Sequence, residues 1–415
     1  MKRILQSVIA SLLRVCARKL LRKHSPKIVA ITGSVGKTST KFAIAKVLET
    51  TYKVGWHEGN YNSEVGLPLA MFEVEAPSKA TSIIQWIRVF AKIAKKLVNW
   101  DYSYEILVLE LGISEPGEMD HHLQFVKPDI GIVTAVQGAH LDGMGSLDAV
   151  FQEKIKVANA AQYALVNIDN TLLLEYAQNT GCHTYNTPTK ITRTKTGTLQ
   201  YLYDDLKISS KLIAPYQLSA QTAAIHVAKR FDVPADSIVD SLETMEPFKG
   251  RVVLYKGRND SQLIDDTYNN VSVLAAKASI ANLSDFPGKR KILILGSLNE
   301  MGAGSQDGHE EVGAFAAKHV DILITIGDMA EKWLAASAKK NGLKEVVSFK
   351  NPVDAGGYVA TILKKGDVVL TKGSQNGVYS EEALKKLLKN PRDSITLVRQ
   401  STQWLDLKRK QFPSI

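Results

Sequence analysis

Short apolar runs alternate with helical patterns along most of this chain. The runs 28–31, 105–111 and 129–136 are apolar almost throughout, which is typical of strands buried on both faces of a parallel sheet. The segments between them repeat apolar residues at helical spacing. Strands that alternate with helices in this way predict an α/β fold with a mostly parallel sheet covered by helices.

The strand-and-helix pattern starts afresh after residues 247–251, which read as a linker. The strands predicted beyond it are 252–255, 262–266, 291–296, 321–327 and 367–374. We therefore expect a central domain over residues 27–250 and a C-terminal, Rossmann-like, doubly wound domain over residues 251–415. The tail after residue 394 is predicted to add an edge strand.

Residues 1–26 differ from the rest of the chain in charge. The chain has 52 Lys and Arg against 42 Asp and Glu, a net charge of +10, and residues 1–27 supply +8 of it without an acid. The remaining residues are nearly balanced, so a nucleic-acid partner is not expected. Apolar residues at helical spacing predict an amphipathic helix over residues 1–24. Docking on its own domain and lying on an anionic membrane are both open for this helix.

A second basic segment, residues 82–100, has four cations, no acid and a helical apolar pattern. Membrane-surface contact through residues 1–24 and 82–100 is therefore one expectation, and a core helix is the alternative. No stretch is long and apolar enough to predict a transmembrane helix. The two cysteines, Cys16 and Cys182, suggest neither a disulfide framework nor a metal site. We expect a cytoplasmic protein, with peripheral contact to the inner face of a membrane left open.

The candidate chemistry begins at residues 27–39, KIVAITGSVGKTS. An apolar strand, a loop with two glycines and a helical pattern follow one another, which is the context of a phosphate-binding loop. Lys37 would reach the outer phosphates of ATP, and a hydroxyl of Thr38 or Ser39 would hold Mg²⁺. The loop is a short form, since Ile31 stands where the common longer pattern has glycine. ATP and Mg²⁺ are the expected cosubstrate and cofactor.

Two further residues follow predicted strands at the edge where ligands of open α/β sheets bind. Glu110 ends the run 105–111, and His140 comes shortly after the run 129–136. A buried carboxylate is costly without a partner, so Glu110 indicates a metal ligand, an ion pair or an edge strand. His140 is interpreted as a metal or phosphate contact, although a lone histidine is more often a satisfied structural residue.

The order of the motifs resembles the Mur ligase family. They read TGSVGKTST, GNYNSEVGLP, VLELGISEPGEM, AHLDGMGS followed by Lys154, NIDN, GR, DDTYNN and TKGS. Within the family the chain is most similar to the ligases that add D-alanyl-D-alanine to UDP-N-acetylmuramoyl-tripeptide. Folylpolyglutamate, cyanophycin and poly-γ-glutamate synthetases are related enzymes.

This resemblance implies a ligase that activates a carboxylate as an acyl phosphate and joins it to the amine of an amino acid or dipeptide. The carboxylate would be a small molecule or carried on a lipid, and the pathway would be peptidoglycan or related envelope synthesis. The residues that the resemblance assigns to ATP are Gly33, Ser34, Gly36, Lys37, Thr38, Ser39, Gln221, Arg251 and Asp266. Those assigned to Mg²⁺ and catalysis are Lys37, Thr38, Glu110, His140 and a carbamylated Lys154. Those assigned to the substrates are Asn60, Asn62, Lys372 and Ser374.

The chain also departs from the family pattern. A basic helix stands where the family has an N-terminal UDP-sugar-binding domain, so that domain is expected to be missing. Gln221, Ser297 and Gln375 replace side chains typical of the adenine and acceptor regions. Two other functions therefore remain open, a ligase that makes or tailors a poly-amino acid and a non-catalytic nucleotide-binding scaffold at a membrane.

Overall fold

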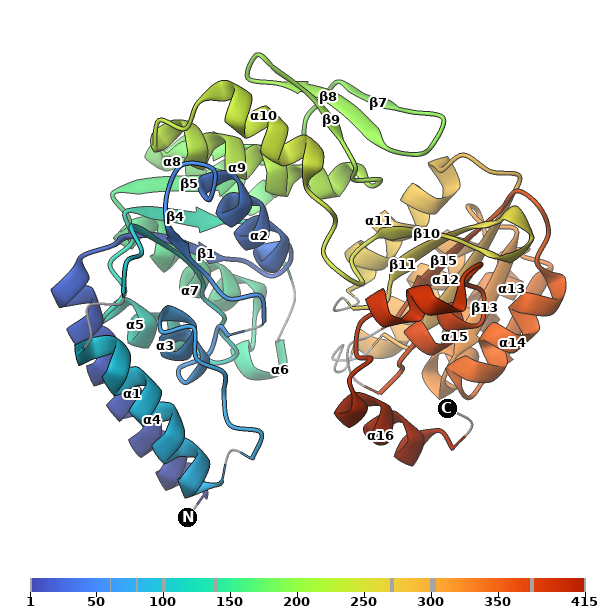
Figure 1. The fold of residues 1–415 in the computed structure, drawn as a ribbon. Helices are drawn as coiled ribbons and strands as arrows, with labels where there is room; N and C mark the ends of the chain where they lie inside the picture. Colours follow the sequence, from blue (N-terminus) through green and yellow to red (C-terminus); the bar gives the residue numbers. More distant parts are fainter. Residues whose placement is uncertain are drawn as a thin grey trace. The chain divides into compact units, whose positions relative to one another are not determined.

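The computed structural model describes residues 2–59, 61–79, 81–98, 102–137, 141–268, 272–298, 304–373 and 377–413. The chain divides into two compact units, each an α/β structure, which confirms the predicted fold class (Figure 1). Unit 1 contains Met1–Lys190, Leu202–Ile208 and Gln217–Met245, and unit 2 contains Ile191–Tyr201, Ser209–Tyr216 and Glu246–Ile415.

Unit 1 is organised around a six-stranded sheet with the order β2-β3-β1-β4-β5-β6, in which every neighbouring pair is parallel. The strands are β1 (Lys27–Thr32), β2 (Val54–Gly55), β3 (Ile106–Glu110), β4 (Ile130–Val133), β5 (Tyr163–Asn167) and β6 (His183–Tyr185). Strands β1, β3 and β4 lie side by side inside the sheet. The loops that follow these strands therefore meet at one edge of the sheet.

Helices cover both faces of this sheet (Figure 1). They are α1 (Lys2–His24), α2 (Lys37–Leu48), α3 (Gly66–Met71), α4 (Ile83–Val98), α5 (Glu118–Leu123), α6 (Leu141–Met144), α7 (Leu147–Ala160), α8 (Thr171–Thr180), α9 (Leu218–Arg230) and α10 (Ala235–Thr244). Helix α1 occupies the predicted N-terminal position and packs against α3 and α4. Its residues Ile9, Leu13, Ala17 and Leu20 belong to the core of unit 1.

Unit 2 has its own six-stranded sheet with the order β10-β11-β15-β12-β13-β14, in which only β10 runs antiparallel to its neighbour. The strands are β10 (Val253–Lys256), β11 (Gln262–Asp266), β12 (Arg290–Gly296), β13 (Ile322–Ile326), β14 (Glu345–Phe349) and β15 (Asp367–Lys372). Successive residues of β12 alternate between two hydrophobic clusters, as expected for a strand covered on both faces. A separate three-stranded sheet is formed by β7 (Ile191–Arg193), β8 (Leu199–Tyr203) and β9 (Leu206–Ser210).

The helices of unit 2 include α11 (Val273–Asp285), α12 (Ser305–Ala316), α13 (Ala336–Lys340) and α14 (Pro352–Ile362), with a π-helical turn at Ala330–Ala335. The C-terminal helices are α15 (Glu381–Lys385) and α16 (Thr402–Gln411). The prediction of an edge strand in the tail is wrong, because this segment forms a 3₁₀ turn (Pro391–Thr396) and helix α16. Over the described part of the chain, no helix is long and apolar enough to cross a bilayer.

Candidate active site

The predicted phosphate loop connects β1 to α2, and two of its glycines have backbone conformations that other residues rarely adopt. Gly36 directly precedes α2 with a φ of 84°. Gly33 has a φ of 150°, and a Cβ atom there would lie 2.0 Å from Oγ1 of Thr134. The loop can therefore close tightly against the segment after β4 only because position 33 has no side chain.

Hydrogen bonds hold this loop to the segment 134–137. The amide of Ser34 donates to the carbonyl of Ala135 at 2.8 Å. The Ser34 hydroxyl accepts from the amide of Gln137 at 3.0 Å and donates to the Gln137 carbonyl at 3.1 Å. The Thr134 hydroxyl donates to the carbonyl of Val35 at 2.6 Å. The loop is thus fixed in shape by contacts at its N-terminal side, and the start of α2 faces the site.

Glu110 ends β3, an interior strand, which excludes the edge-strand interpretation. Its carboxylate is buried and accepts hydrogen bonds from the Thr38 hydroxyl at 3.1 Å and the Asn62 amide at 3.0 Å. The ammonium of Lys41 lies 3.4 Å from the same carboxylate. Glu110 therefore forms an ion pair and also lies beside the Thr38 hydroxyl at the phosphate loop.

The oxygen atoms of Thr38 and Glu110 suit Mg²⁺. This ion usually binds through one or two carboxylates together with substrate phosphates and water rather than in a cage made of protein alone. Within the described ranges there is no group of three or more His, Cys, Asp or Glu side chains that could hold a metal. The Thr38 hydroxyl and the Glu110 carboxylate, adjacent at the phosphate loop, are the side chains that would hold the ion.

Two lysines converge on the carbonyl oxygen of Gly33. The ammonium of Lys37 donates to it at 2.7 Å and that of Lys154, from α7, at 3.2 Å. Lys154 is almost completely buried. Burial, helped by the charge of Lys37, lowers the pKa of Lys154 to about 7, and the opposing effect of Glu153 is weaker. Lys154 therefore has a substantial neutral fraction at neutral pH.

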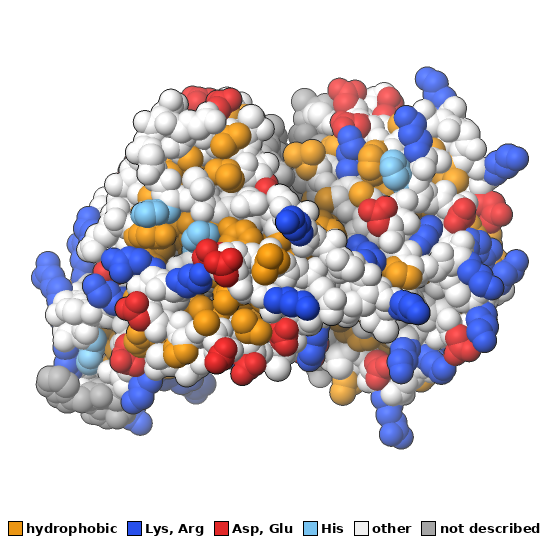
Figure 2. Space-filling view, turned by 90° about the horizontal axis from the view of Figure 1, so that it is seen from above, with side chains coloured by type: hydrophobic (Ala, Val, Ile, Leu, Met, Phe, Trp, Pro, Cys, Tyr) orange, Lys and Arg blue, Asp and Glu red, His pale blue; other side chains and the backbone are white. Residues whose placement is uncertain are grey.

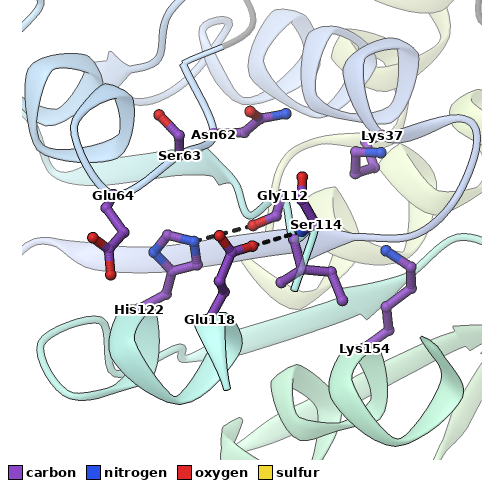
Figure 3. A pocket seen from close by; sticks show the side chains of 10 residues that line it. Lys37, Asn62, Ser63, Glu64, Gly112, Ser114, Glu118, His122 and Lys154 are labelled. Atoms are coloured by element: carbon purple, nitrogen blue, oxygen red, sulfur yellow. Dashed lines mark hydrogen bonds between the residues drawn. The ribbon is translucent and has the colours of Figure 1, made fainter. Parts of the chain in front are cut away.

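A cavity of about 170 Å³ opens beside these groups. Lys37 and Lys154 lie at one end of it, and Glu64, Glu118 and His122 lie at the other (Figure 3). The remaining lining residues are Asn62, Ser63, Gly112, Ile113 and Ser114. The cavity therefore offers cations to phosphates at one end and polar side chains to a substrate at the other.

Glu118, His122 and Lys41 are among the site residues that were not predicted from the sequence. Glu118 accepts hydrogen bonds from the amides of Ser114 and Glu115 just after β3. His122 is held by the carbonyl of Gly112 at 3.1 Å, and burial lowers its pKa. Glu118 and His122 are four residues apart on α5, a spacing that puts both on one helix face. Lys41 follows Lys37 at the same spacing on α2, so helical periodicity was the available signal.

The predicted site residues of unit 2 form a second cluster. Asp266 ends β11 and Lys372 ends β15, and the two residues are direct partners across the parallel pair. Their buried side chains form an ion pair of 2.5 Å, and Ser279 donates to the same Asp266 oxygen at 2.8 Å. Arg251 lies at the start of this unit, where its amide donates to the carbonyl of Phe248.

The other predicted residues are not brought to the cavity or are not described. Gln221 is buried in α9 and donates to the carbonyl of Leu242 at 3.1 Å, and it does not line the cavity. Ser39 lies in the first turn of α2. Asn60, His140 and Ser374 fall outside the described residues.

Comparison with known families matches both units. The family described as "Mur ligase middle domain" matches residues 31–85 and 89–228. The family described as "Mur ligase, glutamate ligase domain" matches residues 250–375.

Curated relatives carry the same name in several bacteria. The UDP-N-acetylmuramoyl-tripeptide–D-alanyl-D-alanine ligase of Bacillus subtilis is 26% identical over 394 residues, which cover 91% of this chain and 79% of the relative. The protein of that name from Synechocystis is 28% identical over 372 residues, 88% of this chain and 75% of the relative.

Solved structures give the same result. MurF ligase from Thermotoga maritima in complex with ADP superposes with a TM-score of 0.73 at 25% identity, over 91% of this chain and 83% of that one. MurF from Acinetobacter baumannii superposes with a TM-score of 0.74 over 92% of this chain and 81% of that one. Its 20% identity supports the fold alone.

Proposed function

Because this chain belongs to the Mur ligase family, we propose that it is an ATP-dependent ligase that joins a substrate carboxylate to the amine of an amino acid or dipeptide. The observation that carries this proposal is the meeting of Lys37, Lys154, Thr38 and Glu110 at one edge of the sheet of unit 1. A phosphate loop alone would suit any nucleotide hydrolase. A buried lysine of low pKa beside the phosphate loop is a feature that simple hydrolysis does not need.

The reaction has two steps that need charge neutralisation more than acid–base chemistry. A carboxylate oxygen attacks the γ-phosphorus of ATP, the bond to the β-phosphate oxygen breaks, and an acyl phosphate and ADP result. The amine then attacks the acyl carbon, and phosphate leaves with formation of the amide. Lys37 and the loop amides hold the phosphates, and bound Mg²⁺ would supply positive charge beside Thr38 and Glu110.

We propose that Lys154 acts as a carbamate. Its neutral amine attacks CO₂ and releases a proton, which turns a cation into an anion. The ammonium form would repel Mg²⁺ beside the phosphate loop, whereas the carbamate would attract it. A lysine with a pKa of about 7 is prepared for this reaction, since the neutral amine is the reactive form.

The identity of the substrates is taken from the relatives. They are named for UDP-N-acetylmuramoyl-tripeptide as carboxylate donor and D-alanyl-D-alanine as amine. We propose a donor and an amine of these chemical classes for this chain. A donor carried on a lipid is a second candidate, favoured by the exposed isoleucines and cations of α4, since these would keep the enzyme near such a substrate.

Release of phosphate from ATP tests the proposal. With UDP-N-acetylmuramoyl-tripeptide and D-alanyl-D-alanine as probes, release should require both, and Lys37→Ala should lower it by about a hundredfold or more. Lys46→Ala, on the exposed end of the same helix, is the matched control and should leave the rate unchanged. Amine-independent phosphate release would contradict a ligase, and ATP binding without any turnover would favour a scaffold. A rate seen only with lipid-linked donors would identify the second candidate.

A further inference from the structure

Helix α4 exposes a continuous apolar face to solvent. Its exposed residues include Ile84, Ile87, Ala91, Ala94 and Val98, which recur every three or four positions and so lie on one side of the helix. Ile84, Ile87 and Val98 are 67%, 62% and 71% exposed. The opposite side of the helix packs into the core of unit 1 through Trp86, Val89 and Ile93. The exposed stripe is therefore additional to what folding requires.

Cations border this stripe along one edge. Arg88, Lys92 and Lys95 each follow a stripe residue by one position and are exposed. None of the three forms an ion pair with any residue in the described ranges, whereas Lys96, further round the helix, lies 3.6 Å from Glu73. Among the described residues, Glu73 and Glu75 line a cavity together with Lys92, Lys95 and Lys96. Glu73 is already engaged by Lys96 and by the hydroxyl of Tyr104. Glu75 then stands against the three cations Arg88, Lys92 and Lys95, so the outer edge of α4 stays positive.

Helix α1 lies beside α4 and repeats the arrangement (Figure 1). Val8, Leu12 and Val15 are about half exposed and occupy one face, and the exposed cations Lys19 and Arg22 follow further along the helix. The ammonium of Lys23 donates to the carbonyl of Leu97 at 2.7 Å, so the C-terminal ends of the two helices meet. The cations of both last turns are thus close to one another.

We propose that α4, with α1 beside it, is a docking surface for an anionic phospholipid bilayer. Isoleucine and valine side chains would enter the boundary between headgroups and acyl chains, and Arg88, Lys92 and Lys95 would contact lipid phosphates. The face visible in Figure 2 carries cations and acids interspersed, whereas the sequence of α4 contains cations and no acid. A second copy of the chain fits this surface less well, because its own α4 would bring like charges together.

The test is flotation of the full chain with lipid vesicles in the absence of nucleotide, so that its outcome does not depend on the proposed ligase reaction. Vesicles that mix phosphatidylcholine with phosphatidylglycerol should bind the protein, and binding should weaken as salt is raised. Vesicles of phosphatidylcholine alone should bind it much less. Each cation near an anionic surface contributes about a fivefold increase in affinity, so Arg88→Glu/Lys95→Glu should lower binding at least about tenfold.

The apolar stripe is tested separately by Ile84→Glu/Ile87→Glu, which should also lower binding at least about tenfold. Ile395→Glu is the matched apolar control, since Ile395 is 77% exposed in unit 2. Lys339→Glu/Lys340→Glu is the charge control on an exposed end of α13. All four variants change exposed residues and should keep the unfolding midpoint of the parent chain, which thermal unfolding verifies.

Three results would overturn the proposal. One is failure of the full chain to float with anionic vesicles at low salt, and another is equal flotation of the two α4 variants and the parent. The third is sedimentation showing that α4 mediates self-association, with Ile84→Glu/Ile87→Glu dispersing the oligomer and no vesicle binding. Deletion of α1 is not a clean test, because Leu13, Ala17 and Leu20 complete the core of unit 1.

Discussion

Lys41 and Glu110 are both removed from water, yet each charge has close partners. Glu110 accepts hydrogen bonds from Thr38 and Asn62, and Lys41 also donates to the carbonyl of Gly59 at 3.0 Å. Removal of one member of such a pair leaves the other charge buried and uncompensated. Lys41 therefore holds the carboxylate in position as well as balancing its charge.

Lys41→Met should lower the free energy of unfolding by about 3 kcal/mol, because Glu110 then lacks its cation. Lys46→Met on the same helix is the control. Lys46 pairs with Glu49 at the surface, so its loss should cost less than about 1 kcal/mol. Urea unfolding of the two variants measures the difference, and equal effects would contradict the role assigned to Lys41.

Lys154 makes the activity depend on pH in a defined direction. Below a pH of about 7 its ammonium form predominates and cannot react with CO₂, so turnover should fall as pH falls through about 7 and rise above it. Added bicarbonate should raise the rate most near that pH. The pH–rate profile at low and high bicarbonate measures this, and a profile indifferent to bicarbonate would contradict the carbamate.

Lys154→Ala should lose most activity, and a small carboxylate such as acetate should restore part of it by replacing the carbamate. Lys156→Ala, two residues further along α7, is the control, because Lys156 is less buried and pairs with Asp120 and Glu153 rather than with the phosphate loop. Rescue of Lys154→Ala but no effect of acetate on Lys156→Ala is the expected outcome. Full activity of Lys154→Ala without acetate would show that Lys154 has no part in the mechanism.

Single residues of the site were predictable where a local motif carried them. Lys37 and Thr38 follow from the glycine loop, and Glu110 follows from a charge at the end of an apolar strand. Lys41 and His122 were missed, since helical spacing places them on the same faces as Lys37 and Glu118 but does not show whether a side chain is buried. Gln221 donates to a backbone carbonyl of α10, and its contact with adenine stays a prediction. Long-range packing decides such cases, and it leaves no mark on neighbouring positions.

At the scale of elements, the β1–α2 loop depends on close contact with the end of β4. Gly33→Ala should weaken ATP binding at least about tenfold, because the new methyl group would collide with Thr134 and distort the loop. Gly181→Ala is a matched control with a positive φ and open space around it, and should cost about 1 kcal/mol of stability only. Titration with ATP compares the two variants. Unchanged ATP binding by Gly33→Ala would show that the loop can shift to make room for the methyl group, and would contradict the prediction.

Elements were predicted best where the apolar pattern was strong, as in β1, β3 and β12. The tail was predicted as a strand, but it forms α16. The reason is visible at Lys408, which is completely buried between Glu381 and Glu382 at 2.7 and 2.6 Å. A helix held in place by an ion pair has a polar inner side, so hydrophobic periodicity does not reveal it. The short strand β14 and helix α14 were missed as well.

At the scale of the whole molecule, each unit has its own buried core. We therefore expect two calorimetric transitions. ATP with Mg²⁺ should raise the midpoint temperature of the transition that belongs to unit 1. Lys408→Met should lower only the free energy of unfolding of unit 2, by about 3 kcal/mol, because two buried glutamates lose their shared cation. Lys410 is exposed on the same helix, so Lys410→Met should change the free energy of unfolding of either unit by no more than about 0.5 kcal/mol. A single transition shifted by both ATP and Lys408→Met would contradict this independence.

The two-way hydrogen bonding between Ser34 and Gln137 has a consequence for how ligands influence one another. The phosphate loop and the segment 134–137 are bonded to each other in both directions, since the Ser34 hydroxyl accepts from the amide of Gln137 and donates to its carbonyl. A ligand that displaces this segment must change the affinity of the loop for phosphate. By thermodynamic reciprocity, ATP changes the affinity for that ligand by the same factor. The Ser34 hydroxyl would therefore couple ATP binding to the binding of any ligand that shifts segment 134–137.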